Sequence, residues 1–249
     1  MQFVSDTTMQ FVAEQRLGDV LERRLVLGDV PGVLWTPTSA TTSEPLILMG
    51  HPGGLHTMYP RLLTRARRAA ADGFAAATIE LPGSGERPRS ADAEQARADL
   101  RRALVTGEPV EEIIDRLIPP LVAKAVPEWR FTLDALLSLP EIGGPVGYSG
   151  GVIAIGIRLA VVEPRISAAG FFAGSLVPTA TFDEAREITI PVHVLLQWDD
   201  EGNDRDAALR LFDAFGSKEK TLHANMGGHT GVPHFAGEDA ARCFARHLK

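Results

Sequence analysis

A serine at position 149 stands at the centre of the run Gly147-Tyr148-Ser149-Gly150-Gly151. This G-x-S-x-G spacing is typical of a nucleophile elbow, a strained turn between a strand and a helix that presents the serine hydroxyl. Pro145–Tyr148 reads as the end of a strand, and Val152–Ile157 is apolar on nearly every face, as in a buried helix. We therefore predict that Ser149 lies on the turn with its hydroxyl in the open. Because the chain has 24 glycines, a glycine-rich turn that happens to contain a serine is the alternative.

Two further side chains could convert this hydroxyl into a nucleophile. A serine hydroxyl is weak at neutral pH until a histidine accepts its proton, and a carboxylate then fixes the tautomer of that histidine. His229 lies in a glycine-rich loop late in the chain, and Asp200 lies in an acidic loop before it. The order Ser149, Asp200, His229 differs from the orders on the two main serine protease folds.

The acid has competitors in Asp199 and Glu201. Gln197-Trp198 completes the preceding strand, so Asp200 falls where the turn could aim it back at His229. Asp200 is therefore the predicted acid, and its two neighbours remain alternatives. Asp204 is interpreted instead as the N-cap of the helix that follows.

Backbone N–H groups are the expected donors to an oxyanion, whose stabilisation is often the largest single catalytic term. The N–H of Gly150, directly after the serine, is one candidate. The second is expected from the loop Gly50-His51-Pro52-Gly53-Gly54. Pro52 has no N–H, so Gly53 is the prediction, and Gly54 is the fallback.

Four other side chains could contact a substrate. His51 either does so or hydrogen-bonds its own loop, and His56 lies close enough in sequence to line the same pocket. Tyr148 and Trp198 are the aromatic candidates for the pocket wall.

Neither a metal nor a nucleotide cofactor is predicted. His223, His229 and His234 are irregularly spaced, and no cysteine or carboxylate completes a recognisable ligand set. The glycine-rich loops match neither G-x-G-x-x-G nor the phosphate-binding G-K-[ST] element.

The elements that must position these residues alternate between strand-like and helical runs. A hairpin is expected first, joined through Gly28–Gly32, and then buried strands separated by helices. The expected strands are Leu21–Leu27, Val33–Thr36, Pro45–Met49, Phe74–Ile79, Ile166–Phe172, Val192–Gln197 and Lys220–Ala224, and the expected helices include Arg61–Ala71, Trp129–Leu137, Ala207–Phe215 and Glu238–His247. This rhythm predicts a mostly parallel sheet with helices on both faces. All the suspect loops follow strands, at the edge where such sheets bind ligands.

The whole chain, residues 1–249, is interpreted as one α/β domain with a helical, cap-like insertion. The charged, helical stretch of about 84–128 breaks the alternation and is expected to lie over the carboxyl ends of the strands. The 249 residues and 45% apolar content of the whole chain suffice for a single large core.

Composition also bounds the partners. The net charge of −7, without a clustered basic face, argues against nucleic acid and against an anionic membrane. Cys243 is the only cysteine, which excludes an internal disulfide and suits a reducing compartment. The first residues lack the pattern of a signal peptide or membrane anchor, so a cytoplasmic location is the expectation. A homodimer is compatible with the sequence.

At this point the chain resembles the α/β-hydrolases, and more narrowly the dienelactone-hydrolase-like and prolyl-oligopeptidase-like bacterial esterases. Four segments carry the resemblance: Gly50–Gly54, Gly147–Gly151, Gln197–Glu201 and Gly227–Gly231. In that family an acidic residue follows the catalytic acid, which supports Asp200 over Asp199. Two departures stand out: Gly202-Asn203-Asp204 replaces the usual apolar continuation, and the elbow is more compact than the family's G-x-S-M-G form.

The resemblance implies a serine hydrolase that cleaves a carboxylic ester, thioester or lactone of a small molecule through an acyl-enzyme. A biosynthetic acyltransferase, lyase or cyclase on the same fold is the first alternative. A catalytically silent binding module is the second.

Overall fold

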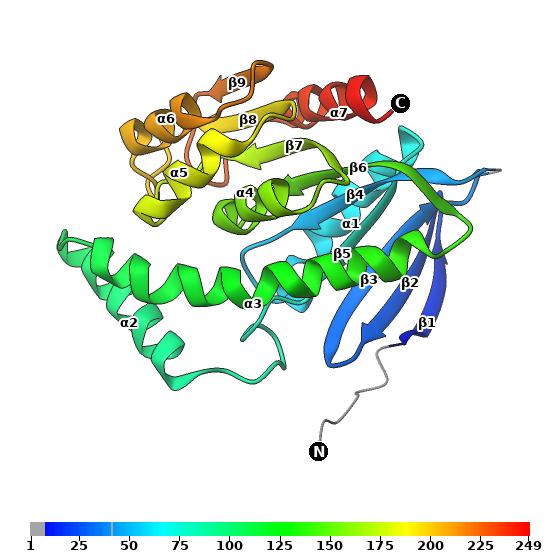
Figure 1. Ribbon diagram of the computed structural model, residues 1–249, viewed down its shortest axis with the longest axis horizontal. Coiled ribbons are helices and arrows are strands. Elements are labelled where there is room, and N and C mark those ends of the chain that lie inside the picture. The colour runs from blue at the N-terminus through cyan, green and yellow to red at the C-terminus, as the bar shows by residue number, and fades with distance from the viewer. Residues whose placement is uncertain (1–7, 41) are drawn as a thin grey trace.

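One mixed sheet organises the molecule (Figure 1). The computed structural model describes residues 8–40 and 42–249, and within them nine strands pair in the order β1-β2-β3-β5-β4-β6-β7-β8-β9. The strands are β1 (Met9–Leu17), β2 (Val20–Leu27), β3 (Val30–Pro37), β4 (Glu44–Gly50), β5 (Ala75–Ile79), β6 (Ile142–Gly150), β7 (Ile166–Phe172), β8 (Val192–Gln197) and β9 (Lys220–Asn225). Pairing is antiparallel from β1 to β5 and parallel from β5 through β4 to β9.

Helices cover both faces of this sheet, as predicted. They are α1 (Leu55–Ala71), α2 (Ala91–Thr106), α3 (Glu111–Leu137), α4 (Ile153–Val162), α5 (Thr179–Glu187), α6 (Arg205–Ala214) and α7 (His234–Leu248). One core joins α1 and α7 to residues such as Ile47 and Met49. The other core packs the helices α3, α4, α5 and α6 against residues such as Leu46 and Leu48. Successive residues of a strand point to opposite faces, so β4 supplies both cores and reads as an unbroken apolar run.

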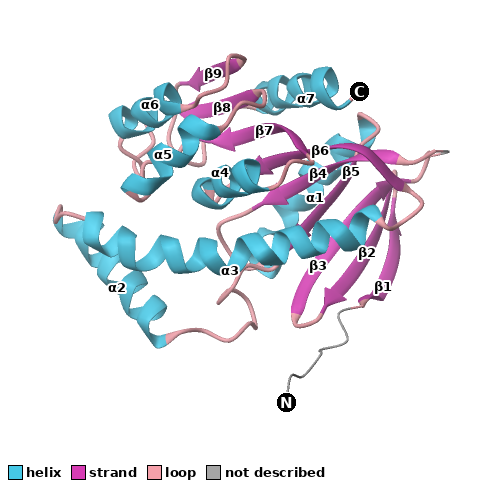
Figure 2. Cartoon of the chain, in the orientation of Figure 1, coloured by secondary structure: helices cyan, strands magenta, loops and turns pink. Residues whose placement is uncertain are grey.

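The parallel strands bring four loops to one edge. The carboxyl ends of β4, β6, β8 and β9 are followed by the segments that begin at His51, Gly151, Trp198 and Met226. In Figure 2 the arrowheads of β6, β7 and β8 point the same way, toward α4, α5 and α6. The loops that were singled out in the sequence therefore meet at this edge.

The stretch of about 84–128 is helical, but it is not separate from the core. The sequence predicted a core helix that begins near Trp129, whereas α3 runs without interruption from Glu111 to Leu137. Ile114 and Ile118 of its first half form a small apolar cluster with Ala154 of α4, and α2 packs along the same half. The insertion thus lies beside the start of α4, next to the candidate elbow.

Candidate active site

His229 and Asp200 meet at the carboxyl edge of the sheet. The Nδ1 atom of His229 lies 2.8 Å from Oδ2 of Asp200. The carboxylate is shielded, with its side chain 4% exposed, whereas the imidazole is 47% exposed. The imidazole is therefore oriented by a buried acid and remains accessible to a substrate.

The acidic loop after β8 is shaped around this pair. Asp200 also accepts hydrogen bonds from Asn203 Nδ2 at 2.9 Å and from the Gly202 N–H at 2.8 Å. Burial alone would raise the pKa of Asp200, but the bonds from His229, Asn203 and Gly202 together lower it. Glu201 accepts the His229 backbone N–H at 3.0 Å. Asp200 is thus an ionised acceptor, and Glu201 holds the histidine loop in place.

Ser149 does not occupy the turn that the sequence predicted. It is the penultimate residue of β6 and pairs with Met49 on one side and Gly170 on the other. The positive φ of the turn, 118°, falls on Gly150, and no residue other than glycine among those described has a positive φ. The prediction that Ser149 itself lies on the strained turn was therefore wrong, although a strand precedes it and a helix follows it as predicted.

The hydroxyl of Ser149 is held by Arg65 of α1. Arg65 Nη2 donates to Ser149 Oγ at 3.1 Å and to the Ser149 carbonyl at 2.7 Å, and Nη1 donates to the Gly50 carbonyl at 3.2 Å. Burial lowers the pKa of Arg65 to about 10, so the guanidinium stays charged at neutral pH. Arg65 therefore places a buried positive charge at the carboxyl ends of β4 and β6.

The pairing of β6 with β7 and the contact of His229 with Phe172 show how Ser149 lies relative to the histidine. The ring of Phe172 packs edge-on against His229, with 5.3 Å between centroids. Gly170 is the residue of β7 that pairs with Ser149. Phe172 lies two residues further along β7, or roughly 6–7 Å. Among the described residues, no hydrogen bond joins Ser149 to His229. The structure brings Asp200 and His229 together, and it pairs Ser149 with a residue two positions before Phe172 on β7.

Comparison with known proteins finds matches among solved structures alone: no family model and no curated protein matches the sequence. A cold-adapted esterase from an Arctic intertidal metagenomic library is 26% identical, with a TM-score of 0.77 over 96% of this chain and 100% of that one. The acetyl xylan esterase of a Thermoanaerobacterium species is 13% identical, with a TM-score of 0.67 over 97% and 88%. A glucuronoyl esterase from Solibacter usitatus is 12% identical, with a TM-score of 0.64 over 96% and 85%. The chain has the α/β-hydrolase fold.

Within this fold the predicted oxyanion loop is anchored through its histidine. His51 is 1% exposed, and its Nε2–H donates to the Ile79 carbonyl at 2.9 Å. Burial lowers the pKa of His51, so the ring is neutral. The sequence offered a substrate contact or a bond within the loop of His51, and the hydrogen bond in the structure instead goes to the end of β5. Gly53 and Gly54 follow it and lie half-buried before α1.

Tyr148 is not part of the substrate surface. Its side chain is fully buried between the rings of Trp129 and Phe171, with 6.2 Å between centroids in each case. The prediction that it contacts substrate was wrong, because strand alternation turns Tyr148 to the face opposite Ser149. Trp198 is 36% exposed, with the Arg205 guanidinium 4.4 Å from its ring centre, and His56 is exposed on the first turn of α1.

Sequence reasoning missed three residues around this site: Arg65, Phe172 and Glu80. Arg65 stands in a helix with several arginines, and periodicity alone does not show which one faces the strand ends. Phe172 reads as the apolar end of a strand. Glu80 carried a signal, since a charged residue directly after the buried run Ala75–Ile79 is unusual.

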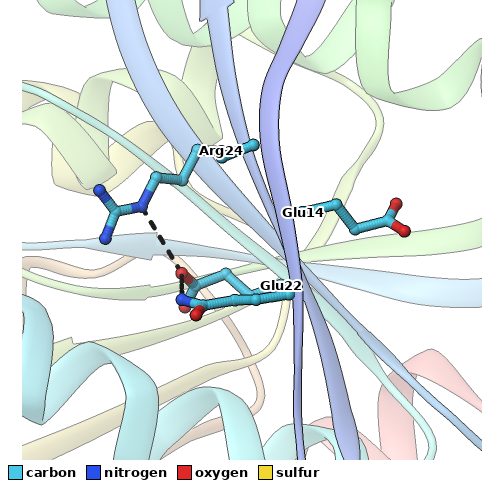
Figure 3. Close-up of a pocket in the computed structure, with 5 residues that line it drawn as sticks. Glu14, Glu22 and Arg24 are labelled. Carbon is cyan, nitrogen blue, oxygen red and sulfur yellow. Dashed lines mark hydrogen bonds and ion pairs between the residues drawn. The ribbon is translucent and has the colours of Figure 1, made fainter.

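Two other features lie outside this pair of residues. In the part of the chain that the structure describes, no three His, Cys, Asp or Glu side chains are grouped as a metal site would require. The hollow on the β1–β2 hairpin in Figure 3 is lined by Glu14, Glu22 and Arg24, together with Ala13 and Gln15. Glu22 there accepts hydrogen bonds from Trp35, Tyr59 and Gln15, so its carboxylate supports the hairpin.

Proposed function

We propose that this chain is a carboxylic ester hydrolase acting on a small organic ester, thioester or lactone. The observation that carries the proposal is the Asp200–His229 hydrogen bond at the carboxyl edge of this fold. The esterase names of the solved structures that are 25–26% identical over nearly the whole chain support the same chemistry.

The proposed reaction follows the serine hydrolase scheme. Ser149 Oγ forms a bond to the substrate carbonyl carbon and gives its proton to Nε2 of His229, while Asp200 stabilises the resulting imidazolium. The carbonyl oxygen becomes an oxyanion that the N–H groups of Gly53 and Gly150 receive, with Gly54 as fallback. His229 returns the proton to the departing alcohol or thiol. Water then cleaves the acyl-enzyme by the same steps in reverse order.

This scheme requires a movement at the end of β6. Ser149 Oγ must exchange its bond to Arg65 for one to His229, which lies further out along the strand direction. The glycines Gly150 and Gly151 are the residues that permit such a change, because neither carries a side chain. Binding of the ester is the step proposed to drive it.

A panel of p-nitrophenyl esters with increasing acyl length, combined with a fluorophosphonate serine probe, tests the proposal. The wild type should hydrolyse at least one ester and take up the probe, and Ser149→Ala should lose both activities. His229→Ala should lose turnover as well. Probe labelling that persists in Ser149→Ala would remove Ser149 from the scheme, and no turnover of any ester would overturn the esterase proposal itself.

A second route is favoured by the position of Ser149 inside β6 and its bond to Arg65. His229, oriented by Asp200, can take a proton from water directly, and the resulting hydroxide then attacks the ester without an acyl-enzyme. Ser149→Ala would then keep its turnover while His229→Ala loses it, and no serine would be labelled. The biosynthetic alternatives predict negligible turnover of simple esters although Asp200 and His229 are intact.

The insertion of residues 84–128 is proposed to form a cap that bounds the substrate pocket. The support is its packing against the residues just after the elbow, through Ile114 and Ile118. Over the described residues, no helix is long and apolar enough to cross a bilayer.

A further inference from the structure

Glu80 is a buried carboxylate that the proposed reaction does not use. It directly follows β5, is 6% exposed and forms no ion pair with any described side chain. Arg87, the nearest cation, donates to the Glu80 main-chain carbonyl at 2.9 Å, but its remaining bonds go to both carboxylate oxygens of Glu128. A buried carboxylate without a cation costs several kcal/mol. A structural or functional role is therefore expected for Glu80.

The carboxylate of Glu80 binds the residue that follows the oxyanion loop. The N–H of Leu55, the first residue of α1, donates to Oε1 at 3.0 Å and to Oε2 at 3.2 Å. At the other end of the loop, His51 bonds to the carbonyl of Ile79. Residues 52–54 are therefore tied at both ends to two consecutive residues at the end of β5.

The loop around Gly85 approaches the Glu80 carboxylate closely. Gly85 has a φ of 56°, and a Cβ there would lie 2.4 Å from Oε2 of Glu80. A Cβ on Gly54 would lie 3.2 Å from the Gly85 N atom. The loop around Gly85 thus wraps the carboxylate and presses it toward Gly54.

The loop held in this way has unused donors. Neither Gly53 nor Gly54 donates its N–H to another group in the described part of the chain. Loop N–H groups stabilise an oxyanion only if they are fixed before the reaction, since reorientation during it would cost free energy. A misplacement of about 1 Å can lower a rate about a hundredfold.

We propose that Glu80 is a positioning residue that fixes the N–H groups of Gly53 and Gly54 for the developing oxyanion, by anchoring Leu55. The proposal rests on the proposed ester hydrolysis and holds for either route, because both pass through an oxyanion. The negative charge of Glu80 does not cancel the benefit. It faces the N-terminus of α1, where the helix carries a partial positive charge.

Two substitutions test the anchor from its two sides. Glu80→Gln keeps the shape and replaces the charged acceptor by a neutral one, which makes a hydrogen bond about half as strong. Leu55→Pro removes the donated N–H, and proline suits this position: it is the first residue of a helix, and Gly54 before it is extended, with φ −69° and ψ 146°. Leu55→Ala controls for the lost side chain. Glu163→Gln controls for loss of a buried carboxylate at the opposite edge of the sheet, before β7.

The expected results are specific to positioning. With the best p-nitrophenyl ester, kcat should fall about tenfold in Glu80→Gln and about 10–100-fold in Leu55→Pro, with KM nearly unchanged. The double variant should be no slower than Leu55→Pro alone, because both changes break one bond. Both controls should keep kcat within about twofold. Lowered thermal stability with unchanged kcat would overturn the proposal.

An NMR measurement separates this inference from the proposed function. Backbone ¹⁵N relaxation of Gly53 and Gly54 should report an ordered loop in the wild type and a lower order parameter in Glu80→Gln and Leu55→Pro. If the loop is equally ordered in all proteins, Glu80 does not position it, whether or not the wild type hydrolyses an ester. If the loop loosens but no ester is turned over, only the esterase proposal is overturned.

Discussion

Three hydrogen bonds hold the carboxylate of Asp200. Its carboxylate receives His229, Asn203 Nδ2 and the Gly202 N–H, and it is almost fully shielded. The side chain of Asp199, one residue earlier, is exposed and makes no hydrogen bond to a described residue. The competition between the two acids is therefore resolved in the geometry by the direction of the turn after β8.

Asp200→Asn should lower kcat/KM about 10³–10⁴-fold, because an amide can no longer select the tautomer and stabilise the imidazolium of His229. Asp199→Asn is the matched control and should stay within about twofold of wild type. Steady-state kinetics with the best ester of the panel measures both. Equal losses in the two variants would show that the loop, rather than Asp200, matters.

At this scale the sequence was informative where chemistry and loop position coincided. Asp200 and Gly53 follow strands with clear apolar runs, so their edge could be predicted, whereas His229 follows the mostly polar strand β9 and was recognised by its glycine-rich loop. The Arg65 contact could not be predicted, because it depends on how α1 crosses the ends of β4 and β6. The position of Ser149 inside β6 depends on a two-residue difference in where the strand ends, at Gly150 rather than Tyr148, which no periodicity resolves.

The element that most constrains the site is the junction of β6 and α4. Gly150 combines a φ of 118° with a close approach: a Cβ there would lie 2.4 Å from the Gly50 carbonyl oxygen and 3.1 Å from Arg65 Nη2. A Cβ on the adjacent Gly151 would meet no heavy atom within 4 Å, and its φ lies outside the left-handed region. Two neighbouring glycines thus differ sharply in what they tolerate.

Gly150→Ala should lower the free energy of unfolding by about 2–3 kcal/mol or more, because it adds both backbone strain and a steric clash. Gly151→Ala should change it by less than about 1 kcal/mol. Urea denaturation of the two variants measures the difference. Equal stability of both would contradict the described end of β6.

Elements with a clear apolar signature were predicted closely, and others were missed. Ile166–Phe172 and Val192–Gln197 were predicted with the bounds that β7 and β8 have. β1 was not predicted, because this edge strand is exposed on both faces and so lacks an apolar alternation. α5 was missed for a related reason: only Thr181 and Ala185 of it are buried.

For the molecule as a whole, a polar layer lies between the sheet and α7. His193 of β8 is 3% exposed, bonds Thr221 through Nδ1 at 3.1 Å and contacts the ring of His223, which in turn bonds Asp239 of α7 at 2.9 Å. Burial, reinforced by His223 and opposed by Asp239, lowers the pKa of His193 to about 4.

This lowered pKa predicts an acid-sensitive fold. The unfolded chain binds a proton at His193 near pH 6.5, whereas the folded chain resists protonation until about pH 4. Stability is therefore full above pH 6.5 and falls as the pH drops toward 4, by on the order of 3 kcal/mol. Denaturation at several pH values should show this slope, and His193→Gln should remove the part due to His193, leaving only that of His51, whose pKa burial also lowers. His234→Gln, at an exposed histidine, should leave the slope intact.

Glu163 acts in a separate, lower window. Its hydrogen bonds to Arg165, opposed by burial, lower its pKa to about 2, so its contribution is present above pH 4.5 and is lost as the pH falls toward 2. A slope between pH 6.5 and 4.5 therefore belongs to the buried histidines His193 and His51, and the part that His193→Gln removes belongs to His193. A slope confined to pH values below 4.5 would contradict the role given to His193.

Because α3 is continuous, a small tilt at its buried end displaces its far end by a larger distance. The helix is fixed at Trp129, which is fully buried in the core, and its first residue, Glu111, is 18 residues away, or about 27 Å at 1.5 Å per residue. A tilt of roughly 5° at the core end would displace the far end by about 2 Å, which exceeds the length of a carbon–carbon bond. Under the proposed function, with the insertion as a cap, small changes in packing around Trp129, remote from any ester, would then change the acyl length that the pocket accepts.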